Sequence, residues 1–197
     1  MKRARATGLS LMLLAAWVGG GTAQTATSRP IPAGTAAEGT LSFDGRANVG
    51  DFTGTTSTLS GSMTGGADLG AVRGWVEAPV ATVKTGKDRR DRDLLKSMEA
   101  DKYPTIRFDL ESVVPAAPAD SLPITLKGRL TIHGVEREVE LPGTLVLTAD
   151  RARVRSDFPL NLKDYKIGGL SKMMGMLRMY EDIKVHVDVT FQLQGEK

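Results

Sequence analysis

The sequence of 197 residues contains no cysteine, only two histidines and only 5% aromatic residues. Without cysteine the chain has no disulfide framework and no acylation site for a lipoprotein anchor. It also lacks a Gly-x-Ser-x-Gly elbow, a zinc-protease His-Glu motif and a phosphate-binding glycine loop. We therefore expect neither an enzyme nor a cofactor, and we expect stability to come from a packed core.

No apolar run approaches the roughly 20 residues that a membrane-spanning helix needs. The longest apolar run covers only residues 9–18. Lys2, Arg3 and Arg5 precede it, and the small residues 21–23 follow it. This arrangement is typical of a secretory signal peptide at 1–23. We expect export to the periplasm, with the extracellular medium as the other destination, and no stable membrane span.

An excess of positive charge is missing from the mature chain. The whole sequence has 26 basic and 23 acidic residues, and the predicted signal peptide holds three basic residues and no acidic ones. The mature chain is therefore formally neutral. Such a balance offers no general electrostatic basis for nucleic-acid binding.

The remaining chain reads as a flexible leader at 24–39, rich in Ala, Thr, Pro and Gly, followed by one domain at 40–197. Apolar and polar residues alternate with period two, most clearly over 183–194, which indicates strands with one buried face. We expect an all-β fold of about eight antiparallel strands, as a closed barrel or a sandwich. The expected strands lie at 41–49, 51–60, 61–68, 70–83, 105–113, 122–132, 135–149 and 151–162, plus 183–194.

Two segments have helical rather than strand spacing. The first is 91–100, where Asp91 or Asp93 could cap the helix. The second is 169–180, which holds half of the methionines of the chain. Because methionine adapts to irregular apolar surfaces, this segment could be a lid over a cavity or ordinary core closing one barrel end. A thioether site for Cu(I) is disfavoured, since no histidine or cysteine lies nearby.

The two histidines fall on the polar parity of their strands. His186 lies in the last strand, and His133 precedes Gly134 at an expected hairpin turn. We expect both side chains to be solvated and not to converge on a metal site.

Three stretches carry a family resemblance. They are Thr85-Gly86 with 90–94, then 103–108, then 130–141. Together they resemble the YceI-like family over residues 38–194. The resemblance implies a lipocalin-like, eight-stranded antiparallel barrel whose channel holds an extended polyisoprenoid chain with a quinone-like or diphosphate head. The sequence departs from the family pattern at Asp93, at 99–100 and in the longer segment 164–180.

Strand parity and this resemblance together nominate the ligand-binding residues. The expected lining is Phe108, Leu126, Leu130, Val139, Leu145, Phe158, Val187 and Val189, with Met173, Met174 and Leu177 near a mouth. Arg89, Arg90 and Arg92 are candidates for a head-group rim, or else belong to a solvated loop whose ion pairs contribute little. The alternative is a filled barrel that docks a protein partner through 169–180. A homodimer is left open.

Overall fold

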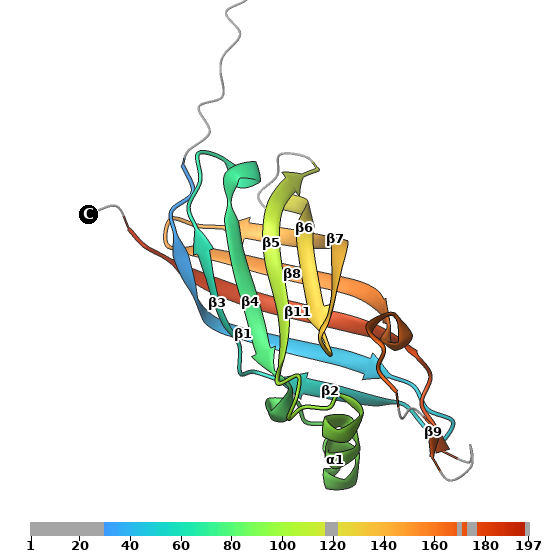
Figure 1. The fold of residues 1–197 in the computed structure, drawn as a ribbon. Coiled ribbons are helices and arrows are strands. Elements are labelled where there is room, and N and C mark those ends of the chain that lie inside the picture. Colours follow the sequence, from blue (N-terminus) through green and yellow to red (C-terminus); the bar gives the residue numbers. More distant parts are fainter. Residues whose placement is uncertain (1–29, 117–121, 169–170, 173–176, 196–197) are drawn as a thin grey trace, which may run out of the picture.

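The structure is a computed structural model, and it describes residues 30–116, 122–168, 171–172 and 177–195 (Figure 1). Eight strands of the described chain form one ring in which neighbouring strands are antiparallel. These strands are β1 (Gly34–Gly45), β3 (Ser60–Thr64), β4 (Arg73–Pro79), β5 (Thr105–Pro115), β6 (Leu122–Ile132), β7 (Val135–Leu147), β8 (Arg151–Asn161) and β11 (Asp182–Leu193).

Pairing of the first strand with the last closes the ring. The register of β1 and β11 runs from Gly34 opposite Leu193 to Asp44 opposite Lys184. A sandwich would leave these strands as separate edges, so the barrel is confirmed and the sandwich is excluded. A further strand, β2 (Phe52–Thr56), extends the wall beside the second half of β1.

The alternation seen in the sequence places the core inside the ring. In β6, Ile124, Leu126, Leu130 and Ile132 are all buried. The same parity buries Ile183, Val185 and Val189 in β11. Because successive side chains of a strand point to opposite faces, the apolar set of every strand meets at the barrel axis.

The first strand starts earlier than expected. Residues 34–39 were predicted to belong to a flexible leader, but β1 begins at Gly34 and pairs with β11 from its first residue. Ladder hydrogen bonds join backbone groups, so a segment of Gly, Thr and Ala can complete a sheet without large apolar side chains. That part of the leader prediction is therefore wrong.

The helix predicted at 91–100 is present as α1 (Asp88–Ser97), below one end of the barrel in Figure 1. Neither predicted aspartate caps it, because Lys87 is the N-cap residue and offers no side-chain hydrogen bond. Asp91 instead accepts hydrogen bonds from the backbone N–H and the hydroxyl of Thr85, at 2.8 and 2.6 Å. Short 3₁₀ turns complete the described helical structure: η1 (Leu69–Ala71), η2 (Val80–Thr82) and η3 (Leu162–Tyr165).

The helix predicted at 169–180 is wrong wherever that segment is described. Two short strands, β9 (Ser171–Lys172) and β10 (Leu177–Arg178), pair with each other instead. The backbone that follows pairs with the β1–β2 connection: Asn48 N–H donates to the Arg178 carbonyl, and Tyr180 N–H donates to the Arg46 carbonyl. These partners satisfy the backbone in an extended conformation.

Candidate ligand-binding cavity

A cavity of about 410 Å³ runs through the barrel interior. All eight barrel strands contribute apolar side chains to its wall, among them Leu41, Met63, Val76, Phe108, Leu126, Leu145, Phe158 and Val187. Ile31, Leu69 and Val72 line the end beside η1, opposite α1. A wall of this composition excludes water and favours an apolar guest.

Most of the strand residues that parity predicted for the lining do line this cavity. The cavity is lined by the predicted residues Phe108, Leu126, Leu130, Leu145, Phe158, Val187 and Val189. Ligand binding by these side chains stays a prediction. Of the three residues expected near a mouth, Met173 and Met174 lie outside the described residues, as does the side chain of Leu177.

Val139 is a correction, because it does not line the cavity. It is partly buried, packs against the core and lies opposite Gly128 in the β6–β7 register. In the described ladders, β8 pairs only with the end of β7, from Thr144 to Leu147. The first half of β7 is therefore not held against β8, and inward parity alone does not bring Val139 to the cavity.

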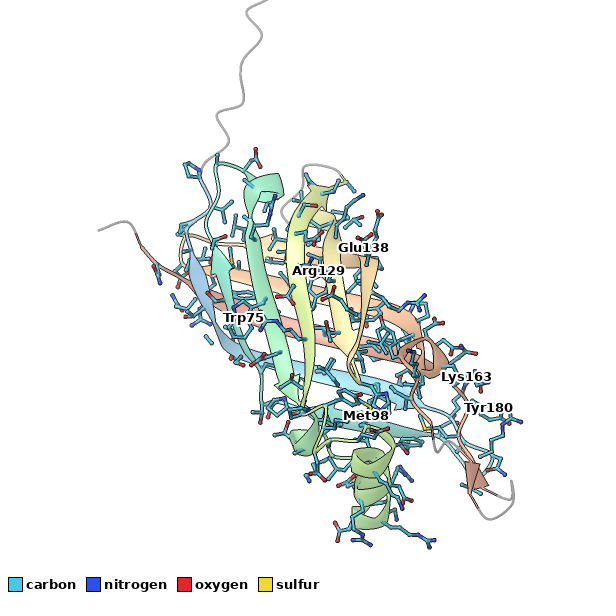
Figure 2. All side chains as sticks on the ribbon, in the orientation of Figure 1. Trp75, Met98, Arg129, Glu138, Lys163 and Tyr180 are labelled. Atoms are coloured by element: carbon cyan, nitrogen blue, oxygen red, sulfur yellow. The ribbon has the colours of Figure 1, made fainter. Side chains whose placement is uncertain are left out.

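The cavity opens at the α1 end. Val49, which is 70% exposed, lines the cavity, and so does the exposed Arg178. Because a side chain that lines a cavity and also reaches solvent marks its edge, these residues define a mouth. Met98, at the end of α1, is buried against the same wall (Figure 2).

One face of α1 contributes to this mouth. Arg90, Asp93, Leu94 and Ser97 line the cavity, which is the spacing of one helical face. Arg89 and Arg92 are exposed and do not line the cavity, so only Arg90 of the predicted arginine rim lies there. The number of charges in this segment does not indicate which face of the helix turns to the barrel.

The loop before α1 is tied to the helix by Asp91. Hydrogen bonds from the hydroxyl and the backbone N–H of Thr85 hold the pKa of the Asp91 carboxyl below its usual range. Gly86, between the two, has a φ of +72°, a conformation that favours glycine. The Thr85-Gly86 motif therefore fixes where α1 starts relative to the barrel.

His133 was predicted to be solvated, and that prediction is wrong. The turn position is correct, with a φ of +51° before Gly134 at +70°, but the side chain is only 8% exposed. The Tyr165 carbonyl lies 3.1 Å from Nδ1, and since a carbonyl can only accept, Nδ1 carries the proton. The ring packs edge-on against Tyr103, with centroids 4.8 Å apart. His133 thus joins the β6–β7 turn to η3 and to the α1–β5 connection.

His186 lies on the outer wall of the barrel, as its parity predicted. The carboxylate of Asp157 contacts Nδ1, and that of Asp44 lies 3.1 Å from Nε2. Hydrogen bonds to these two carboxylates raise the pKa of His186 above its ordinary value. In the described part of the chain, no cluster of His, Asp and Glu has the arrangement of a metal site.

Raising the pH should cost the folded protein stability through His186. A raised folded pKa means that the contribution is complete below the unfolded pKa of about 6.5 and is lost as the pH rises through the folded value. We expect the thermal unfolding midpoint to fall as the pH rises above about 6.5. In His186→Gln this part of the pH profile should flatten. An unchanged slope in the variant would assign the dependence to other groups.

A closed antiparallel barrel around an apolar cavity defines a lipocalin-like fold. The model of the YceI-like domain matches residues 34–191, so the chain belongs to the YceI-like family. No curated protein sequence matches the chain significantly.

Three solved structures share this fold. The polyisoprenoid-binding domain from Saccharophagus degradans superposes with a TM-score of 0.70 at 15% identity, covering 83% of this chain and 99% of its own. BcnA from Burkholderia cenocepacia gives 0.65 at 16% identity, covering 77% and 95%. The YCEI protein of Campylobacter jejuni gives 0.56 at 18% identity, covering 73% and 85%.

Proposed function

We propose that this protein is exported and holds an isoprenoid or similar apolar chain inside its barrel. The observation that carries this proposal is the apolar cavity that runs from η1 to a mouth at α1. The polyisoprenoid-binding domain of Saccharophagus degradans, which has the same fold, supports the choice of an isoprenoid.

The energetics favour such a guest. Burying one CH₂ group contributes about 0.8 kcal/mol, so a five-carbon isoprenoid unit contributes about 3 to 4 kcal/mol. Association costs about 4 to 15 kcal/mol before any contact is counted. A few units therefore suffice for stable binding, and the chain rather than the head group should supply most of the affinity.

Binding without catalysis fits the polar groups of the cavity wall. Ser156 lies two residues before Phe158 on β8 and also lines the cavity. Its hydroxyl donates a hydrogen bond to the Pro142 carbonyl at 2.6 Å. Neither histidine lines the cavity. Ser156 therefore has no histidine beside it in the described cavity wall, and the proposed role is that of a carrier, store or sensor.

The cavity argues against the alternative function, in which a filled barrel docks a protein partner. That alternative also requires 169–180 to be a helix. The described part of this segment contains β9 and β10 instead. Among the described residues, no helix has the length and apolar character needed to cross a membrane. Export itself is supported by the sequence pattern at 1–23.

The test is to express the full sequence with its N-terminal segment and recover the protein from the periplasmic fraction under mild conditions. We expect a native mass spectrum with one bound lipid, which extraction then identifies as an isoprenoid. The N-terminus of the recovered chain should lie after residue 23. A protein that stays empty with added polyprenyl lipids would contradict the binding role, and retention in the cytoplasm would contradict export.

A further inference from the structure

We propose that the cavity mouth selects chains that end in an anionic head group, and that Arg90 and Arg178 bind this group. The proposal rests on the chain-binding function above and adds the chemistry of the head. Both arginines line the otherwise largely apolar cavity at its α1 end. They come from α1 and β10, which are separate in sequence.

The β1–β2 hairpin brings these two arginines to one rim. Beside its turn, where β2 begins, the Phe52 ring lies under the Arg90 guanidinium, 4.1 Å from the ring centroid. At its tip, Asn48 receives a hydrogen bond from the Arg178 backbone and donates one to the Arg178 carbonyl. Val49, between these two positions, also lines the mouth.

Arg90 is prepared for a ligand. Stacking on Phe52 orders the guanidinium through a cation–π contact and leaves its N–H donors at the ring edge. In the described chain, no carboxylate lies within ion-pair distance of Arg90. The neighbouring Asp91 carboxylate accepts its hydrogen bonds from Thr85. A planar fork of donors suits phosphate or carboxylate oxygens.

Arg178 is exposed, and the nearby carboxylate of Glu181 competes only weakly for its guanidinium. The hydrogen bond from Lys163 Nζ, at 2.7 Å, is the main cause of the lowered pKa of Glu181, and the charge of Arg178 contributes less. The guanidinium of Arg178 is therefore not required to hold Glu181. A head group that reaches the rim meets two arginines, one ordered and one able to close over it.

Two acidic residues also line the cavity. Glu77 on β4 is paired with Arg107 at 3.1 Å, so its charge is compensated. Asp93 lies one turn after Arg90, on the same face of α1.

The experiment compares polyprenyl chains of increasing length, each as the free alcohol and as the monophosphate. We expect the monophosphate to bind more tightly at every length that binds. In Arg90→Gln its affinity should fall by about 10- to 100-fold, the range of a hydrogen bond to a charged group, and Arg178→Gln should act in the same direction. Alcohol affinity should not change in either variant.

Arg89→Gln and Arg92→Gln are the matched controls. They remove the same charge from the same helix at exposed positions that do not line the cavity. Equal losses in all four variants would show a general charge effect and overturn the proposal. Equal binding of alcohol and monophosphate by the unmodified protein would also overturn it, while leaving the chain-binding function intact.

Inorganic phosphate distinguishes a lipid head group from a free anion. We expect millimolar inorganic phosphate not to displace a bound monophosphate, because the chain supplies most of the affinity. Displacement would identify a free-phosphate site instead and overturn the selection of a chain. If neither alcohol nor monophosphate binds at any length, the chain-binding function itself fails.

Discussion

Val187→Arg is expected to abolish uptake of an apolar chain. Val187 lies on β11, opposite Leu41 of β1 and Ser156 of β8, and its side chain lines the cavity. An arginine here would fill the channel and place a charge among apolar side chains, at a cost of several kcal/mol. Titration of the purified variant with a polyprenol should show no saturable binding.

Loss of binding must be separated from loss of folding. Val187→Phe narrows the same channel without a charge and should weaken long chains while keeping the circular dichroism spectrum. Thr40→Arg is the matched control, because Thr40 is exposed and lies opposite Asp188 on the outer wall. It should bind like the unmodified protein. Normal binding by a folded Val187→Arg protein would show that the chain lies elsewhere.

Gly128→Ala adds one methyl group, and of the glycines in the described chain it is the one where this addition should destabilise the fold most. Gly128 is buried in β6, and a Cβ there would lie 2.1 Å from the Asp109 carbonyl oxygen and 3.0 Å from the Phe108 ring. The carbonyl belongs to a strand held on both sides, next to the irregularity between Leu110 and Ser112. Because the backbone must shift, we expect a cost of about 3 kcal/mol, at the upper end for overpacking.

Thermal unfolding measures this effect. A loss of this size lowers the midpoint by about 6 to 12 °C in a domain of 150 to 250 residues. Gly168→Ala makes the same chemical change where no atom lies within 4 Å of the added Cβ, and it should leave the midpoint nearly unchanged. Equal midpoints for both variants would mean that β5 yields easily at Asp109.

Strand parity predicted the strands of the barrel and part of the cavity wall, because both depend on local alternation. In β6, for example, Leu126 and Leu130 are inward by sequence and line the cavity in the structure. Gly128 has inward parity as well, and the Asp109 carbonyl and the Phe108 ring fill the space beside it. The sequence gives the volume of each side chain, but it does not show which neighbour occupies the space beside a small one.

The mouth was harder to predict, because it is built from contacts between distant segments. Arg90 is placed there by the Phe52 ring, and Arg178 by hydrogen bonds to Asn48. The charge of α1 does not separate Arg90 from Arg89. Helical spacing does, because Arg90, Leu94 and Ser97 share the face that turns to the barrel.

The β1–β11 ladder affects how the protein folds. Gly34 pairs with Leu193, so the ring is joined by residues from opposite ends of the sequence. Closing so long a loop costs entropy before any contact repays it, which makes folding slow and keeps both unpaired edges exposed meanwhile. The chamber is complete only when this ladder has closed. A guest able to bind during that step would act as a template for closure, and filling and folding would become a single event.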